Sequence, residues 1–236
     1  MRSVESLIAA NYAQVSGQIA EACRRAGRLA SGVRLVAVTK SAEIAWIEAL
    51  LAIGIRDLAE SRPQQLGERA LLLDKSVCWH LVGHLQRNKV RKVLPAASWI
   101  HSVDTLPLLR RIDDVAGELG LRPRLLLEVN VSGETGKNGF RPNELVAAWP
   151  AVAAVSNVDI AGLMTMAPWT ESPEAARPVF SGLRALRDQL TASSSTVELP
   201  ELSMGMSGDF EVAIEEGATL VRIGTSLFEG LEPHDD

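Results

Sequence analysis

The sequence predicts an α/β fold, a single (β/α)8 barrel of the TIM type that takes in residues 1–236 as one domain. Short apolar runs alternate with longer segments of helical periodicity about eight times along the chain. The apolar runs are nearly continuous, as expected of strands covered on both faces, and their alternation with helices is typical of parallel βαβ units. Eight such units in 236 residues fit a closed barrel. An open doubly wound sheet is the alternative, because periodicity does not show closure.

An extra helix is expected ahead of the barrel. From about Val4 to Arg28 the chain lacks proline and carries apolar residues at helical spacing, among them Leu7, Val15 and Ile19. The strands are then expected, in chain order, at Arg34–Thr39, Ile55–Ala59, Val77–Val82, Trp99–Val103, Arg124–Val131, Val158–Met164, Leu199–Met204 and Thr219–Ile223. The helices between them are expected at Ala45–Ile53, Arg62–Leu73, Gln86–Leu94, Leu106–Leu119, Asn143–Ala154, Pro173–Leu190 and Asp209–Glu216.

Composition narrows the class of protein. The formal net charge of -5 gives no reason to expect attraction to nucleic acid or to an anionic membrane. Cys23 and Cys78 are far apart and form no disulfide or zinc pattern, so a reducing compartment is expected. No apolar run approaches the roughly 20 residues that span a bilayer, and the N-terminus lacks a secretory signal pattern. We therefore expect a cytoplasmic protein.

Lys40 follows the first expected strand directly. The functional residues of such barrels lie at the end of the barrel where the strands finish, which we call the mouth. A lysine placed there can be desolvated, which frees its amine to attack a carbonyl group. The alternative is a solvated lysine that opens a loop.

The last expected strand carries an arginine within an apolar run. A buried charge is costly unless it has a partner, so Arg222 is expected to face a polar group or a ligand inside the barrel. Gly224, Thr225 and Ser226 follow at the expected start of a short helix, which favours phosphate. The turn around Ser207, after the seventh strand, is a second candidate of the same kind. Ordinary helix caps are the alternative for both turns.

Histidine spacing does not predict a metal site. His80, His84, His101 and His234 form no His-Glu-x-x-His pattern. His80 lies in the third expected strand, where it could contact a ligand or be an ordinary buried histidine with a satisfied partner. We therefore expect no metal.

Several collinear segments resemble the pyridoxal phosphate homeostasis protein family, whose members are one-domain relatives of the alanine racemase N-terminal barrel. The resemblance spans nearly the whole chain, and it is far more specific than any single motif. The matching segments are Val36–Lys40, Trp79–Lys89, Ile100–Asp104, Val129–Ser132 with Lys137 and Gly139, Gly162–Met166, Leu202–Ser207 and Val221–Thr225.

The resemblance implies pyridoxal 5′-phosphate (PLP) as cofactor and a fold-type III PLP barrel. Lys40 would hold PLP as a Schiff base, and Arg222 would face the pyridine nitrogen. It also implies phosphate contacts and further pocket residues, namely Ser207, Gly224, Thr225, Ser203, Met206, His80 and Asn130. One position departs from the family. Where the family has Phe-Gly-Glu-Asn after the second strand, this chain has Leu-Ala-Glu-Ser, so Ser61 replaces an asparagine near the cofactor.

Three functions are compatible with these residues. The resemblance favours a PLP-binding protein without dedicated turnover, a monomer that buffers intracellular PLP and could deliver it to PLP-dependent apoenzymes. A PLP-dependent amino-acid racemase is the main alternative. It needs a second base across the ring from Lys40, and the one tyrosine, Tyr12, lies in the N-terminal helix. A cofactor-free aldolase that uses Lys40 on a phosphosugar is the third possibility.

Overall fold

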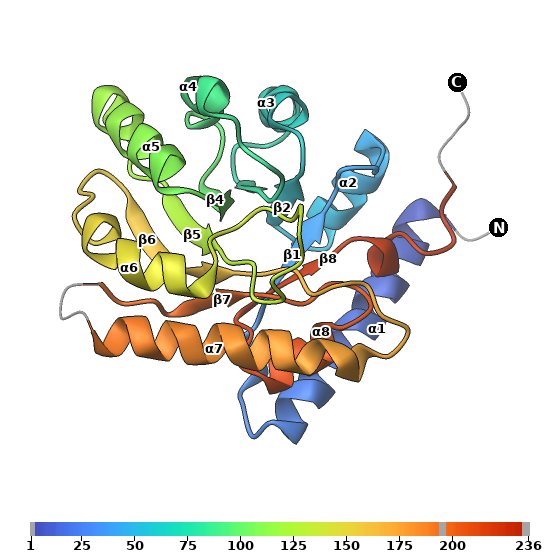
Figure 1. Ribbon diagram of the computed structural model, residues 1–236. Helices are drawn as coiled ribbons and strands as arrows, with labels where there is room; N and C mark the ends of the chain where they lie inside the picture. Colours follow the sequence, from blue (N-terminus) through green and yellow to red (C-terminus); the bar gives the residue numbers. More distant parts are fainter. Residues whose placement is uncertain (1–2, 194–196, 233–236) are drawn as a thin grey trace.

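The structure is a computed structural model, and it describes residues 3–193 and 197–232. Eight parallel strands follow one another around a closed barrel in chain order (Figure 1). This confirms the predicted fold and excludes the open sheet. The strands are β1 Arg34–Val38, β2 Asp57–Glu60, β3 Cys78–Leu81, β4 Trp99–Val103, β5 Arg124–Glu128, β6 Asp159–Met164, β7 Glu201–Ser203 and β8 Leu220–Ile223. His234, one of the four histidines of the sequence, lies outside the described residues.

Helices cover the outer surface of the barrel, as Figure 1 shows. The α-helices are α1 Val4–Arg25, α2 Ile44–Ala52, α3 Pro63–Leu72, α4 Val90–Val93, α5 Leu106–Leu119, α6 Pro142–Val152, α7 Arg177–Ala192 and α8 Phe210–Glu215. The 3-10 turns are η1 Ala30–Gly32, η2 Arg87–Lys89, η3 Pro173–Ala176 and η4 Thr225–Leu227. No helix in the described ranges is both long enough and apolar enough to cross a membrane.

Three of the predicted helices differ from the observed ones. The helix expected over Pro173–Leu190 begins with the 3-10 turn η3, and α7 starts at Arg177. The segment expected to be one helix over Gln86–Leu94 is the turn η2 followed by the four-residue helix α4. The first helix ends at Arg25 and not near Arg28, because Gly27 adopts a left-handed φ of 64°. The N–H of Arg28 then bonds the carbonyl of Cys23 at 2.8 Å. This closes the helix with a Schellman-type reversal.

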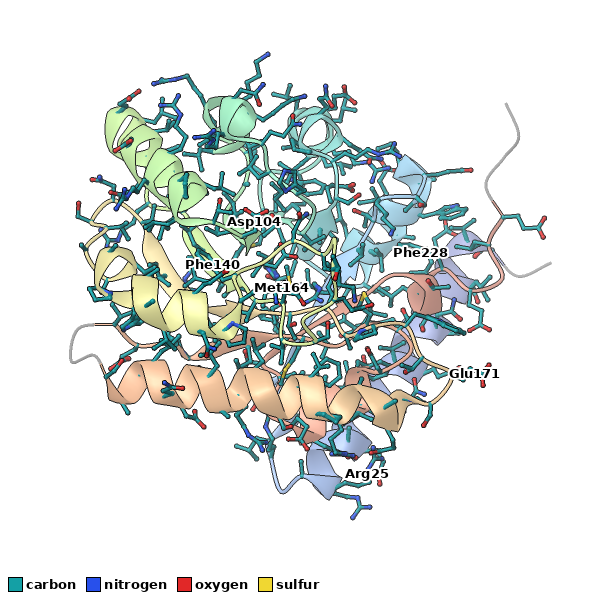
Figure 2. The ribbon with its side chains drawn as sticks, in the orientation of Figure 1. Arg25, Asp104, Phe140, Met164, Glu171 and Phe228 are labelled. Atoms are coloured by element: carbon teal, nitrogen blue, oxygen red, sulfur yellow. The ribbon has the colours of Figure 1, made fainter. Side chains whose placement is uncertain are left out.

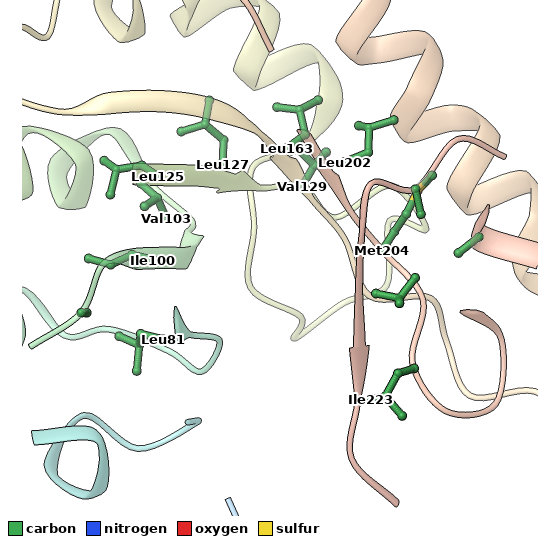
Figure 3. Packing of buried hydrophobic residues seen from close by; sticks show 14 of the residues in the cluster. Leu81, Ile100, Val103, Leu125, Leu127, Val129, Leu163, Leu202, Met204 and Ile223 are labelled. Atoms are coloured by element: carbon green, nitrogen blue, oxygen red, sulfur yellow. The ribbon is translucent and has the colours of Figure 1, made fainter. Parts of the chain in front are cut away.

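Apolar side chains pack on both sides of the strands. The larger cluster fills the layer between strands and helices, and it includes Leu81, Ile100, Leu125 and Leu202 (Figure 3). A smaller cluster lies on the opposite face of the strands, inside the barrel, because successive side chains of a strand point to opposite faces. Its members are Val36, Ala59, Trp99, Leu126, Ala161, Met164 and Leu220.

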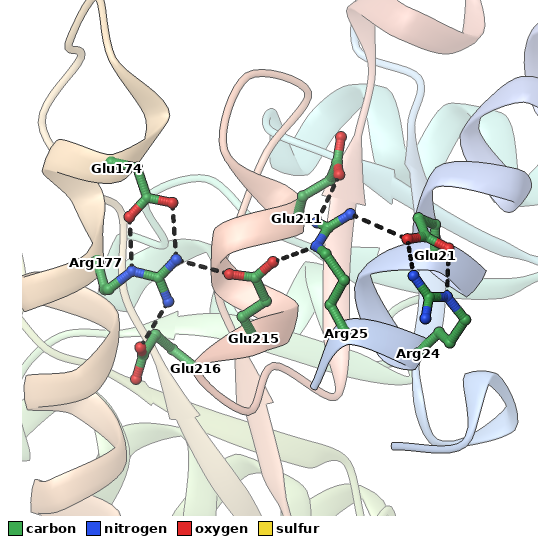
Figure 4. Close-up of polar contacts among 8 residues, drawn as sticks. All are labelled: Glu21, Arg24, Arg25, Glu174, Arg177, Glu211, Glu215 and Glu216. Atoms are coloured by element: carbon green, nitrogen blue, oxygen red, sulfur yellow. Dashed lines mark hydrogen bonds and ion pairs between the residues drawn. The ribbon is translucent and has the colours of Figure 1, made fainter. Parts of the chain in front are cut away.

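Helix α1 is attached to the barrel by packing and by a chain of ion pairs. It packs against α2 and α8. At its last turn Arg25 contacts Glu211 at 2.9 Å and Glu215 at 2.7 Å, and Arg177 contacts Glu215 at 2.7 Å from the other side (Figure 4). These side chains are partly exposed, so the network contributes little energy per pair. Its effect is to fix the position of α1 relative to α8 and α7.

Candidate functional site

Lys40 lies at the mouth, two residues after the end of β1, and its side chain is exposed. Strand β8 is the neighbour of β1 on one side, with Val36 paired to Arg222. The turn that follows β8 rests against the end of β1, because a Cβ on Gly224 would lie 3.3 Å from the carbonyl oxygen of Val38. The fold therefore brings Lys40, Arg222 and Gly224 to one side of the mouth.

Arg222 is a buried cation that points into the barrel. It is 4% exposed, and its Nη1 donates to Ser203 Oγ at 2.6 Å while Nη2 donates to the carbonyl of Thr165 at 3.0 Å. Burial lowers its pKa to about 10, so the guanidinium keeps its charge at neutral pH. Within the described ranges it forms no ion pair with a carboxylate at 4.0 Å or closer. A guanidinium has five N–H donors, so Arg222 has donors left for a ligand such as a ring nitrogen.

The turns after β7 and β8 meet beside Arg222. The backbone N–H of Ser226 donates to Ser207 Oγ at 3.4 Å, which joins the two turns. Thr225 is exposed and Ser207 is half-buried, so both hydroxyls are accessible. The short helix expected after Gly224 is the three-residue 3-10 helix η4. Its hydroxyl and backbone donors remain a suitable lining for an anion, while Met206 beside it is 39% exposed.

His80 is fully buried inside the barrel. Its Nε2 lies 3.0 Å from Asp57 Oδ1, and its Nδ1 lies 2.9 Å from His101 Nε2. Both ring nitrogens are therefore engaged by protein groups. A direct contact between His80 and a cofactor stays a prediction.

Asn130 shapes the loop that follows β5. Its side-chain NH2 donates to the carbonyl of Glu134 at 2.9 Å, and its Oδ1 accepts from the backbone N–H of Gly133 at 2.9 Å. In Figure 1 this yellow-green loop lies across the middle of the view. Because both the NH2 and the oxygen of this side chain bond the backbone of the loop, a contact between Asn130 and a cofactor also stays a prediction.

A buried ion pair supports the Lys40 segment, and sequence reasoning did not find it. Glu60 is fully buried and pairs with Arg69 of α3. Arg69 also donates to the carbonyls of Thr39 at 2.6 Å and Ala42 at 2.5 Å, and the Thr39 hydroxyl donates to Glu60 Oε1 at 2.5 Å. We call Thr39, Glu60 and Arg69 the brace. It fixes the backbone on both sides of Lys40.

Acidic groups line the mouth opposite Lys40. Strand β5 is four positions from β1 in the eight-stranded barrel, so Glu128 at its end lies across the mouth from the end of β1, which leads to Lys40. Burial, together with the neighbouring charge of Asp104, raises the pKa of Glu128 to about 7. Asp104, labelled in Figure 2, also lies 3.1 Å from His84 Nδ1. The sequence offered only one signal for these groups, a carboxylate at the end of an apolar strand.

In the described ranges, one group of side chains of the types that bind metal ions lies close together. Asp57, Cys78 and His80 place one ligand atom each within 4.8 Å of one another. They lie where β2 and β3 begin, at the end of the barrel opposite the mouth. Arg34 lies 4.0 Å from the same Asp57 oxygen, and Asp57 already engages His80 Nε2. A cation there would have to displace both contacts.

The departure at Ser61 falls at a tight backbone contact. A Cβ on Gly83 would lie 2.0 Å from the carbonyl oxygen of Ser61. The loops after β2 and β3 therefore touch through their main chains at this point. Ser61 keeps its backbone position whatever its side chain, so only the side-chain contact with a cofactor is put in question.

Comparison with known proteins gives a consistent picture. The family model of the alanine racemase N-terminal domain matches residues 16–232. The pyridoxal phosphate homeostasis protein of Aquifex aeolicus is 42% identical over 216 residues, which are 91% of this chain and 94% of that protein.

Solved structures also resemble this chain over most of its length. PipY of Synechococcus elongatus, solved with PLP bound, has a TM-score of 0.78 and 38% identity, and the match covers 89% of this chain and 99% of that one. Alanine racemase of Clostridium difficile has a TM-score of 0.74 at 17% identity, and the match covers 97% of this chain but 58% of the racemase. At that identity the likeness to the racemase shows the shared fold alone.

Proposed function

Since this chain belongs to the pyridoxal phosphate homeostasis proteins, within the alanine racemase N-terminal domain family, we propose that it binds PLP at the barrel mouth and serves intracellular PLP homeostasis. The observation that carries the proposal is Arg222, a buried cation with no carboxylate partner within 4.0 Å in the described ranges. It lies beside the strand that leads to Lys40. A relative with 38% identity was solved with PLP bound.

Each residue of the site has a distinct task in this proposal. When bound, PLP supplies an aldehyde that reacts with amines and a ring that can withdraw electrons. The Lys40 amine would bind the aldehyde carbon, and the brace would hold the backbone of Lys40 in place. The hydroxyls of Ser207 and Thr225, with the close approach allowed by Gly224, would bind the phosphate.

Arg222 would set the electronic state of the ring. A guanidinium that faces the ring nitrogen disfavours protonation of that nitrogen, because two adjacent positive charges repel each other. An unprotonated ring withdraws electrons less strongly, which limits carbanion chemistry. The site therefore favours holding PLP over using it for turnover.

Titration of the apoprotein with PLP tests the proposal. Wild type should bind PLP, and borohydride should fix it covalently to Lys40, as shown by peptide mass. Lys40→Ala should lose the covalent product while Lys75→Ala, a change of an exposed lysine before β3, should keep it. Covalent fixation that survives Lys40→Ala would contradict the assignment.

Amino-acid racemisation remains the second candidate because of Glu128. Its pKa of about 7 and its place across the mouth from Lys40 suit a group that exchanges a proton at neutral pH. Tyr12, by contrast, lies in α1 on the outside of the barrel. Conversion of L-alanine to D-alanine by wild type, lost in Glu128→Gln, would favour the racemase. No conversion by the PLP-loaded wild type would favour the homeostasis role.

Delivery of PLP to apoenzymes, a cytoplasmic location and a monomeric state are further parts of the proposal. They rest on the family relationship and on the composition. Transfer is tested by mixing loaded protein with a PLP-dependent apoenzyme in the presence of a scavenger of free PLP. Activity that appears only as fast as free PLP is released would contradict direct delivery.

A further inference from the structure

A continuous chain of hydrogen-bonded side chains crosses the interior of the barrel. From the end opposite the mouth it runs from Asp57 to His80 at 3.0 Å and from His80 to His101 at 2.9 Å. It continues from His101 Nδ1 to Ser203 Oγ at 2.9 Å, and from Ser203 Oγ to Arg222 Nη1 at 2.6 Å. We call these five residues the buried chain. Its members come from the five strands β2, β3, β4, β7 and β8.

The two ends of the buried chain fix the direction of every bond in it. A guanidinium only donates hydrogen bonds, and a carboxylate only accepts them. Arg222 therefore donates to Ser203, and His80 donates from Nε2 to Asp57. Burial lowers the pKa of His80 and lowers that of His101 well below its usual value, so both rings are neutral. Each neutral ring has one N–H and one acceptor nitrogen.

Only one arrangement then satisfies all links. With its proton on Nε2, His80 must accept at Nδ1, so His101 donates from its own Nε2. His101 must in turn accept at Nδ1, so the hydroxyl of Ser203 donates to it. All hydrogens point from Arg222 toward Asp57. The hydroxyl of Ser203 cannot rotate away, and its oxygen stays turned toward Arg222.

We propose that His101 and His80 are positioning residues, which hold the guanidinium of Arg222 in place through Ser203 and so set how it meets the PLP ring. The proposal rests on PLP binding at this mouth. Arg222 is clamped on its other side by the carbonyl of Thr165 at 3.0 Å. Donation from Ser203 to His101 polarises the serine oxygen, which strengthens its bond to the guanidinium. Neither histidine needs to touch PLP.

The direction of the bonds is tested on the apoprotein by the ¹⁵N chemical shifts of the histidine rings. Both His80 and His101 should be neutral with the proton on Nε2 at about neutral pH. Protonation on Nδ1 of either ring would overturn the proposed direction. This measurement does not depend on PLP.

The positioning role is tested by PLP affinity and by the absorption spectrum of bound PLP. His101→Phe keeps a flat buried ring but removes the links to His80 and Ser203, and Ser203→Ala removes the links to His101 and Arg222 with little change in volume. Either variant should weaken PLP binding about tenfold, the loss expected when a bond to a charged group is disturbed, and shift the spectrum. Cys78→Ala, which removes a neighbour of His80 outside the buried chain, should do neither.

A double-variant cycle separates positioning from a merely structural effect. If His101 acts through Arg222, then His101→Phe should weaken binding little further in an Arg222→Met background. Fully additive losses would overturn the inference while leaving the proposed function intact. Failure of wild type to bind PLP would overturn both. If His101→Phe does not fold, the same cycle with His80→Phe, which reaches Arg222 only through His101 and Ser203, decides.

Discussion

The brace offers a direct test of how the fold holds Lys40, through the substitution Arg69→Met. Methionine keeps much of the apolar volume of the arginine side chain but removes its charge and donors. Glu60 would then remain fully buried without its cation. The carbonyls of Thr39 and Ala42 would lose their bonds to Arg69, which are 2.6 and 2.5 Å long.

The size of the effect follows from these contacts. Removing one partner of a buried ion pair costs about 3–5 kcal/mol, because the other charge is left uncompensated. The lost bonds to two carbonyls add about 1 kcal/mol each. The Thr39 hydroxyl still donates to Glu60, and Glu60 Oε2 has no hydrogen-bond partner in the described ranges. We therefore expect a loss of about 5–7 kcal/mol, which a domain tolerates only if its stability lies above the lower end of the ordinary range of about 5–15 kcal/mol.

Urea unfolding and PLP titration measure the two consequences. Arg69→Met should lower the free energy of unfolding by the amount above and weaken PLP binding, because the backbone around Lys40 loses its support. Adding Glu60→Gln should restore about 2 kcal/mol by removing the unpaired charge. Arg62→Met, on an exposed arginine just before α3, should change stability by less than about 0.5 kcal/mol. A loss below about 1 kcal/mol in Arg69→Met would refute the reasoning.

Two further predictions concern the loops and the mouth. In urea unfolding, Gly83→Ala should destabilise the fold by about 3 kcal/mol or more, because the new Cβ would lie 2.0 Å from the carbonyl oxygen of Ser61. The control is Gly17→Ala in α1, where the new Cβ meets nothing within 4 Å. It should stabilise the fold by about 0.5–1 kcal/mol. The pKa of Glu128 is raised from 4.5 to about 7, so the folded carboxyl keeps its proton where the unfolded one has lost it, and its contribution to stability falls as pH rises through that interval. Glu128→Gln should therefore match wild type near pH 5 and exceed it by about 3 kcal/mol near pH 8; an equal difference at both pH values would contradict the shift.

The fold could be predicted from the sequence because its cause is periodic. Parallel strands covered on both faces are nearly continuous apolar runs, and Leu125, Leu126 and Leu127 of β5 are all fully buried. Helix boundaries were harder to predict where one residue decides them. The left-handed conformation of Gly27 ends α1, and that conformation depends on how the chain turns into η1.

The site was predictable only in part, because its contacts join residues that are distant in the sequence. Lys40 can be found in the sequence because it directly follows an apolar strand, and Arg222 because it interrupts one. The hydrogen-bond partners of Arg222 cannot be found in this way, since Ser203 and Thr165 lie 19 and 57 residues away from it in the chain. The link between His80 and His101 likewise depends on the curvature of the barrel. Sequence spacing does not carry that information.

A weaker signal was nevertheless present in the strands themselves. Asp57, His80, His101, Ser203 and Arg222 all occupy inward positions, which alternate with the outward apolar residues of the larger cluster. Because that cluster lies between strands and helices, it holds the barrel together independently of the interior. The interior can therefore contain polar groups, provided that each is bonded. We infer that substitutions inside the barrel affect Arg222 and PLP binding, whereas substitutions in the outer layer affect folding first.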